Sequence, residues 1–206
     1  MTTTRPVTND VGTKPVSSWR TVDIVVASAV AVAFGVVFWA WGHLWNLLDP
    51  AFTAFPPGRA FLYGMWLVPG VLGALLIRKR GAAIYTELVA SIVSALLGVS
   101  WGLNVIAYGL VEGAAAEIVF AFALYRSWRL PAALLAGFLT GVSAALFDFF
   151  AWNAAYDLWD YRVPYALLTI VSSTVVAGAG SWALVRALAP TGVLDRFAAG
   201  RERALV

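Results

Sequence analysis

Four acidic residues lie inside long apolar stretches of this chain: Glu87, Glu112, Glu117 and Asp148. A charged side chain in the apolar core of a bilayer costs at least about 2.5 kcal/mol, so such a residue must face the interior of a helix bundle and find a partner there. The interiors of these stretches contain no lysine or arginine. The acids therefore favour uptake of a cation or hydrogen bonding to a polar ligand, and bonding to a hydroxyl or amide of a neighbouring helix is the structural alternative.

Around Glu112, four polar or aromatic residues recur every three or four positions: Trp101, Asn104, Tyr108 and Glu112 itself. Residues at this spacing share one face of an α-helix. In order, the stripe offers an aromatic ring, an amide, a phenol and a carboxylate, which together can bind a ring that carries amine and hydroxyl groups. Glu117 lies five residues further on, about 140° around the helix and outside the stripe.

Two smaller groupings follow the same helical spacing. Glu87, Ser91 and Ser94 share one face of an earlier stretch, and Asp148 lies one turn before Trp152 in a later one. Ordinary helix packing is the alternative interpretation of every such stripe.

The ten tryptophans are unevenly distributed along the predicted spans. An interfacial aromatic belt, present in most membrane proteins, would occupy both edges of the bilayer. The bias towards one edge favours an externally open pocket that stacks a flat aromatic ligand, and tryptophan also binds cations through its ring face. The outer set is Trp39, Trp41, Trp45, Trp66, Trp101, Trp152 and Trp159, and the inner set is Trp19, Trp128 and Trp182.

The overall composition shows what must position these residues. Of 206 residues, 61% are hydrophobic and 12% are charged, and the mean hydropathy is +0.81. Soluble domains are about 45–50% apolar and about 25% charged, so this composition argues against a soluble enzyme. The chain has no cysteine and a single histidine, His43, which argues against thiolate or histidine metal sites and against common catalytic triads. No Walker A motif is present, so this chain does not itself hydrolyse ATP in the usual way.

Six apolar stretches are candidates to cross a bilayer, which takes roughly 20 residues of helix. The third is the weakest because it is short and carries Glu87 near its start. These stretches predict an all-α membrane protein, a bundle of six transmembrane helices over residues 19–190 with tails at 1–18 and 191–206. The stretches are Val22–Trp45, Ala60–Ile77, Ala82–Gly98, Leu103–Tyr125, Leu130–Trp152 and Val163–Leu188.

The basic residues predict the orientation of the bundle. Six crossings place 12 of the 14 lysines and arginines on one side, and only Arg59 and Arg162 on the other. Because positive residues are enriched on the cytoplasmic side, both termini are expected on the cytoplasmic side of the cell membrane. The 12 are Arg5, Lys14, Arg20, Arg78, Lys79, Arg80, Arg126, Arg129, Arg186, Arg196, Arg201 and Arg203.

Small residues recur every four positions in two of the stretches. Such faces let helix backbones approach closely, and most of them pack within one chain. A sharper interpretation is that the first stretch docks another membrane protein through Ala27 and Ala31. The two series are Ala27, Ala31 and Gly35, and Ala133, Gly137, Gly141 and Ala145.

Several short motifs together resemble the YkoE family, over about residues 20–200. They are Tyr63-Gly64-Met65-Trp66, Ile77-Arg78-Lys79-Arg80-Gly81-Ala82-Ala83 followed by Glu87, Glu112-Gly113 and Ala116-Glu117 within 109–120, Phe147-Asp148-Phe149-Phe150, and Thr191-Gly192-Val193-Leu194.

The resemblance implies a prokaryotic substrate-binding (S) component of an energy-coupling factor (ECF) transporter, which is not an enzyme. It implies uptake of thiamine or its hydroxymethylpyrimidine precursor, with a transmembrane coupling protein (T component) and cytoplasmic ATPase subunits as partners and no cofactor. It also implies an alanine-rich surface on the first helix that meets the coupling protein, which Ala27 and Ala31 fit. The family more usually has glutamine at the position of Glu112, so a carboxylate there favours a more cationic ligand.

The residues and the resemblance together give a set of expected substrate-binding residues. Outer aromatic rings would stack the pyrimidine, Glu112 or Glu117 would accept its amine, and Asp148 or Glu87 would offset a thiazolium charge. The set is Tyr63, Trp66, Glu87, Trp101, Asn104, Tyr108, Glu112, Glu117, Asp148 and Trp152.

Two other functions stay open at this point. The four acids could carry protons in an autonomous secondary transporter of a small cationic or aromatic solute. An intramembrane enzyme acting on lipid or peptide is less well supported, because the chain lacks cysteine and a motif nucleophile.

Overall fold

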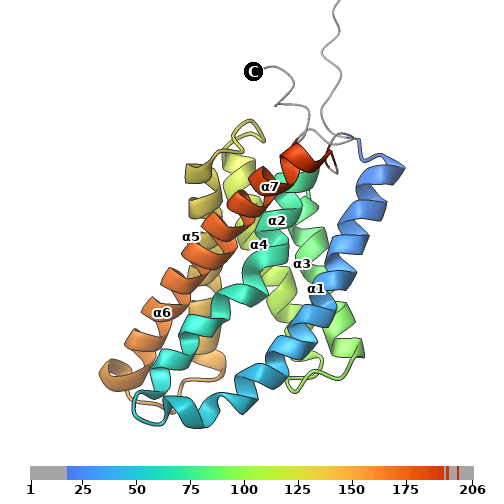
Figure 1. Cartoon of the computed structure of the whole chain (residues 1–206). Coiled ribbons are helices and arrows are strands. Elements are labelled where there is room, and N and C mark those ends of the chain that lie inside the picture. Colours follow the sequence, from blue (N-terminus) through green and yellow to red (C-terminus); the bar gives the residue numbers. More distant parts are fainter. Residues whose placement is uncertain (1–17, 193, 195–198, 200–206) are drawn as a thin grey trace, which may run out of the picture.

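The computed structural model describes residues 18–192, 194 and 199, and within them every regular element is a helix. Figure 1 shows these helices as an elongated bundle, and consecutive elements join into six rods. A short 3₁₀ helix, η1 (Asp49–Phe52), follows the first rod. The rods are α1 (Thr21–Leu47), η2 (Pro56–Leu67) continued by α2 (Val68–Ile77), α3 (Ala82–Leu96), α4 (Asn104–Phe122), α5 (Leu130–Ala151), and a final rod of η3 (Leu158–Arg162), α6 (Val163–Ser173), η4 (Thr174–Gly180), α7 (Ser181–Leu188) and η5 (Ala189–Thr191).

The two ends of the bundle differ, and we name them by their connections. The proximal end carries the start of α1, the α2–α3 and α4–α5 connections and the end of α7 (Figure 1). The distal end carries the α1–η2, α3–α4 and α5–η3 connections. Of the described lysines and arginines, only Arg59 and Arg162 belong to the distal end, because every other one is in or beside a proximal connection.

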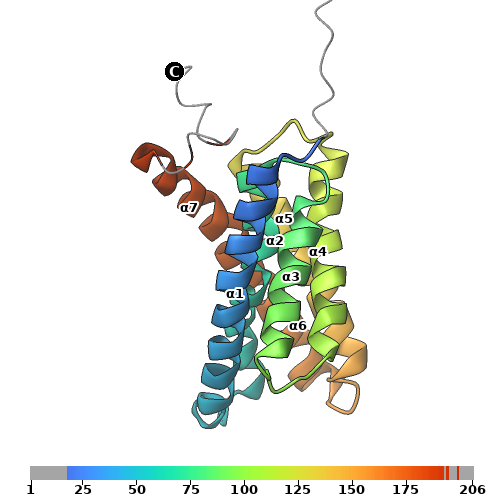
Figure 2. The same ribbon diagram turned by 90° about the vertical axis from the view of Figure 1, so that its right-hand side faces the viewer.

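The predicted six-helix bundle is confirmed. Five rods are long and apolar enough to cross a membrane, and the sixth, α3, is a shorter apolar helix of 15 residues. At 1.5 Å per residue α3 extends only about 22 Å, less than a bilayer core. It lies between α1 and α4, as Figure 2 shows, and packs most extensively against these two helices. The short third stretch is therefore a helix flanked by α1 and α4, and its buried face carries Glu87, Ser91 and Ser94.

The second rod changes its winding halfway along. Its distal half, η2, is a 3₁₀ helix of 12 residues, and its proximal half, α2, is an α-helix buried along its whole length. Ser172 on α6 secures η2, because its hydroxyl accepts a hydrogen bond from the Gly64 amide at 3.0 Å and donates to the Phe61 carbonyl at 2.6 Å. A Cβ at Gly64 would lie 2.5 Å from the Ser172 carbonyl oxygen, so only glycine lets η2 and α6 approach this closely.

The small-residue stripe of α1 faces into the molecule. Ala27 is 1% exposed and Ala31 is 0% exposed, and a Cβ at Gly35 would meet the Val93 side chain of α3. The stripe packs α1 against α3 within the chain. In this structure Ala27 and Ala31 are therefore packing residues, and the partner-facing surface expected at them would have to lie on another face.

This packing role predicts a specific effect of enlarging the stripe. We expect Ala31→Leu to lower the free energy of unfolding by about 1–3 kcal/mol, because added methylenes overfill a tight core. Ala33→Leu is the matched control, since Ala33 is exposed on the opposite side of α1. Thermal unfolding of both variants in detergent measures the difference. Equal stability of the two variants, combined with loss of a partner complex in Ala31→Leu alone, would contradict the packing assignment.

Candidate ligand-binding site

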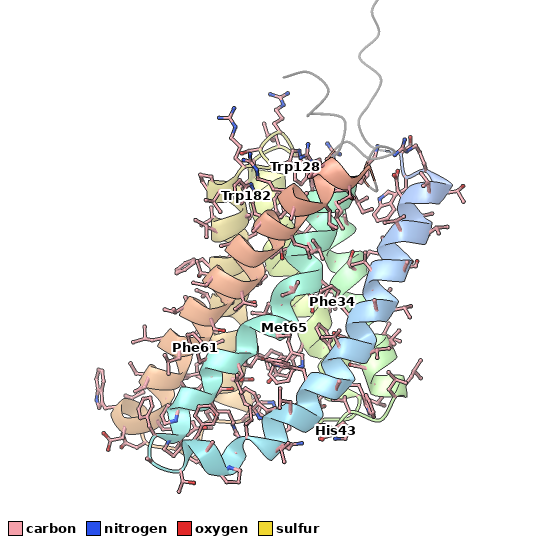
Figure 3. All side chains as sticks on the ribbon, viewed as in Figure 1. Phe34, His43, Phe61, Met65, Trp128 and Trp182 are labelled. Atoms are coloured by element: carbon pink, nitrogen blue, oxygen red, sulfur yellow. The ribbon has the colours of Figure 1, made fainter. Side chains whose placement is uncertain are left out.

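The distal half of the bundle encloses a cavity of about 250 Å³. Every rod contributes to its wall. Figure 3 orients the molecule for this site: Trp128 and Trp182 mark the proximal end, and His43 lies towards the distal end. The cavity is lined by Phe38, Trp45, Arg59, Tyr63, Trp66, Ser91, Ser94, Val99, Trp101, Val105, Tyr108, Glu112, Asp148, Trp152, Asn153, Tyr156, Tyr161 and Tyr165.

Trp66 on η2 is the centre of an aromatic wall. Its ring lies 5.0 Å from Trp45, 5.5 Å from Tyr63 and 5.4 Å from Trp101, centroid to centroid, each in an edge-to-face arrangement. Edge-to-face pairs are favourable and hold ring orientations firmly. Because the four rings come from α1, η2 and the α3–α4 connection, they also join three separate segments around the cavity.

A second wall is a row of tyrosines from the last connection and the final rod. Tyr156 stacks on Tyr161 at 4.2 Å with 18° between the ring planes, and Tyr161 stacks on Tyr165 at 5.8 Å with 14°. Tyr156 is exposed and Tyr165 is buried, so the row leads from the surface into the molecule. Near-parallel rings on this wall suit a flat ligand that stacks along them.

Asp148 on α5 is a buried acid, and each of its two carboxylate oxygens accepts a hydrogen bond. Oδ1 accepts a hydrogen bond from the Tyr108 hydroxyl at 2.5 Å, and Oδ2 accepts one from the Tyr165 hydroxyl at 2.9 Å. Charge-assisted bonds of this kind are stronger than neutral ones. Asp148 therefore fixes the positions of two cavity-lining tyrosines on α4 and α6.

Glu112 on α4 is the lining acid with the most bonding capacity left. Within the described residues its carboxylate accepts one hydrogen bond, from the Tyr63 hydroxyl, and this bond is long, at 3.3 Å. Ser91 and Ser94 of α3 line the same cavity, and the Ser94 hydroxyl donates to the Ser91 carbonyl at 2.9 Å. An ionised carboxylate accepts at both oxygens, so Glu112 can take hydrogen bonds from a ligand.

Glu87 lies outside the cavity lining, one helical turn from Ser91. It is buried, and its Oε2 accepts a hydrogen bond from the Gly70 amide of α2 at 2.6 Å. Its Oε1 is buried without a hydrogen-bond partner among the described residues. Glu87 joins α3 to α2 at the point where the second rod has just changed its winding.

Glu117 lies at the proximal end, away from the cavity. Its carboxylate accepts hydrogen bonds from the Gly81 amide at 2.5 Å, the Ala83 amide at 3.0 Å and the Tyr125 hydroxyl at 2.7 Å. The two amides belong to the start of α3, where helix amides have no partner within the helix. Burial and the bond to Glu117 raise the pKa of Tyr125 to about 12, so its hydroxyl stays protonated and donating at neutral pH. Glu117 thus holds the proximal connections together.

Seven of the ten expected substrate-binding residues line the cavity, and three do not. Besides Glu87 and Glu117, the third is Asn104, which is exposed at the first residue of α4. The seven are Tyr63, Trp66, Trp101, Tyr108, Glu112, Asp148 and Trp152.

Sequence reasoning missed several lining residues, of which Arg59, Tyr161 and Tyr165 matter most. Arg59 precedes the predicted second span, which begins at Ala60, whereas the helix already begins at Pro56. Tyr161 and Tyr165 are four residues apart on the final rod, a spacing that would have revealed a shared face. The cavity as a whole offers ring stacking, carboxylate acceptors and hydroxyls. Within the part of the chain that the structure describes, no group of three or more His, Cys, Asp or Glu could hold a metal ion.

Comparisons with known proteins show the class of membrane protein to which this chain belongs. Residues 22–143 match the family described as "ABC-type cobalt transport system, permease component". The fold matches a solved structure described as "Crystal structure of an S-component of ECF transporter" with a TM-score of 0.84 and 34% sequence identity, covering 91% of this chain and 94% of that one. The chain belongs to the S components of ECF transporters, which are transporter subunits and not enzymes.

One relative indicates which group of S components this chain resembles. The chain is 34% identical over 187 residues to the "Putative HMP/thiamine permease protein YkoE" of Bacillus subtilis (strain 168), covering 90% of this chain and 92% of the relative. The resemblance to the YkoE family is thereby confirmed. Membership of the S-component class implies a small-molecule ligand, and a T component and ATPase subunits as partners.

Proposed function

We propose that the distal cavity captures thiamine or its hydroxymethylpyrimidine precursor. The observation that carries the proposal is that one cavity combines an aromatic wall around Trp66 with the Glu112 carboxylate, which accepts one long hydrogen bond from the described residues. A flat ring with an exocyclic amine needs both features, because its face stacks and its edge donates hydrogen bonds. The name of the Bacillus subtilis relative points to the same two compounds.

In this proposal each lining group has a defined part. The pyrimidine ring stacks against Trp66 and Trp101, and its amine donates to Glu112. Asp148 contributes negative charge while it holds Tyr108 and Tyr165 in place. A volume of about 250 Å³ lies just under the range of about 300–1,000 Å³ of drug-sized pockets, which suits a ligand of one or two small rings.

The orientation belongs to the same proposal. The described basic residues concentrate at the proximal end, which supports a cytoplasmic proximal end in the cell membrane. The distal cavity then opens to the outside and receives its ligand there. Release to the inside requires ATP hydrolysis by the partner subunits, because this chain has no Walker A motif.

Titration of the purified chain tests the ligand directly. We expect tryptophan fluorescence to change saturably with thiamine or with hydroxymethylpyrimidine, because Trp45, Trp66 and Trp101 line the cavity, and we expect calorimetry to give one site per chain. A pyrimidine nucleoside of similar size serves as the control ligand. The absence of heat and of a fluorescence change with both compounds would contradict the proposal.

The structure gives less support to a proton-coupled secondary transporter. That function needs the acids to form a relay, but Glu117 bonds to backbone amides at the proximal end and Glu87 bonds to Gly70. Only Glu112 and Asp148 share the cavity. Uptake by this chain alone in liposomes, driven by a pH gradient, would revive the alternative.

A further inference from the structure

Arg59 is the lining residue whose chemistry the proposed function leaves unused. It lies near the start of η2, and its guanidinium stands over the Trp45 ring, 4.6 Å from the ring centroid. It forms an ion pair with Asp49 of η1 and also interacts with the side chain of Tyr161. The guanidinium is therefore held at the edge of the cavity by an aromatic ring below it and a carboxylate beside it.

One donor of this guanidinium is left over. Arg59 Nε is buried and has no hydrogen-bond partner within the described residues. A buried donor without an acceptor is unfavourable, and most native structures satisfy such groups. Its position on the cavity wall means that a bound molecule can supply the missing acceptor.

The cavity therefore has two chemically opposite ends. Arg59 lies four residues distal to Tyr63, roughly 8 Å along a 3₁₀ helix at 2.0 Å per residue. The Tyr63 hydroxyl contacts Glu112. The Glu112 carboxylate thus lines the deeper part, where a ligand donates hydrogen bonds, and the Arg59 guanidinium lines the distal part, where a ligand must accept them.

The present partner of Arg59 can be replaced. The Asp49 side chain is 63% exposed, so it regains water easily when it leaves the pair. Exposed ion pairs contribute little to stability, so replacing Asp49 by a ligand oxygen costs little free energy. Arginine presents its donors in a planar fork that matches the oxygens of a phosphate or a carboxylate.

We propose that Arg59 forms a subsite that donates hydrogen bonds to an oxygen at the second end of the ligand. This oxygen belongs either to a hydroxyl group or to the phosphate monoester of that hydroxyl. Without ligand, the Asp49 carboxylate pairs with the Arg59 guanidinium, and the ligand oxygen displaces this carboxylate when it binds. This inference rests on the proposed function, since the ring end of the ligand is taken to lie at Glu112. It adds that the alcohol end is recognised and that a phosphorylated form of the same compound is accepted.

Binding of thiamine and of thiamine monophosphate to four variants tests the subsite. We expect Arg59→Gln to weaken the phosphate ester about tenfold, the loss of one charge-assisted contact. Arg59→Lys keeps the charge but removes Nε and the fork, so it recovers only part of the affinity. Asp49→Asn removes the competing carboxylate and should tighten the phosphate ester relative to thiamine. Arg186→Gln is the matched control, because Arg186 lies over Trp182 at the proximal end.

The two probes distinguish the source of the oxygen. A loss confined to thiamine monophosphate identifies a phosphate site, and an equal loss with thiamine identifies a hydroxyl site, provided that Asp49→Asn does not weaken binding. Unchanged binding of both probes to Arg59→Gln would overturn the subsite, as would weaker binding of both to Asp49→Asn, which marks the ion pair as structural. If the wild-type chain binds neither these probes nor hydroxymethylpyrimidine, the proposed function fails as well.

Discussion

Replacing Glu112 with alanine is expected to raise the Kd for the pyrimidine ligand about 100-fold. Hydrogen bonds to a charged group contribute about 1.5–3 kcal/mol, and each 1.4 kcal/mol is a factor of ten in affinity. Glu112→Gln keeps an acceptor oxygen without the charge, so we expect a loss of about tenfold there. Isothermal titration calorimetry on each purified variant measures both values.

Glu117→Gln is the matched control for this prediction, because it makes the same chemical change at the proximal end. Its carboxylate bonds to Gly81, Ala83 and Tyr125 and not to the cavity. We expect a lower melting temperature but a Kd within about twofold of wild type, since distant sites are usually independent. If Glu112→Ala bound the ligand normally, or if Glu117→Gln lost as much affinity, the assignment of Glu112 would be wrong.

The second large effect is expected at Trp66. Stacking of a base on an aromatic side chain is worth about 1–3 kcal/mol by alanine substitution, so Trp66→Ala should weaken binding about 10- to 100-fold. The loss should be at the upper end of this range, because Trp66 also supports the rings of Trp45 and Trp101. Trp66→Phe retains a stacking face and should recover most of the affinity.

Trp182→Ala is the control for Trp66, because Trp182 lies at the proximal end (Figure 3) and its ring contacts the Arg186 guanidinium and not the cavity. Calorimetry gives the affinity of each variant, and a thermal melt without ligand separates a loss of binding from a loss of folding. Normal affinity in a folded Trp66→Ala variant would show that the aromatic wall does not contact the ligand.

Most of the fold could be predicted because the bilayer imposes a simple length rule. Apolar stretches of membrane-spanning length gave six helices whose ends differ from the structure by a few residues. The winding of η2 could not be predicted in this way. It depends on Ser172, more than one hundred residues away, which bonds to the Gly64 amide and the Phe61 carbonyl.

The site was predictable where a single helix carries it. Tyr108 and Glu112 lie one turn apart on α4 and both line the cavity. Asn104 does not follow them, because α4 begins at that residue and its side chain is exposed. Trp101 reaches the cavity from the connection before the helix, so its place in the helical stripe was fortuitous.

The roles of the other acids depended on contacts between helices. Spacing showed the faces of Glu87 and Glu117, but it could not show which backbone amides would be free to receive them. Gly81 has a positive φ of 80°, which lets the chain turn and present the first amides of α3 to Glu117. Such an amide donor is invisible in a sequence, whereas a hydroxyl or carboxylate is not.

A structure of the chain determined with bound thiamine or hydroxymethylpyrimidine tests the central claim most directly. We expect density for the ring in the distal cavity, stacked on Trp66 or Trp101, with its amine within hydrogen-bonding distance of Glu112. Density at another place, or a ligand in the cavity whose amine contacts no carboxylate, would contradict the account.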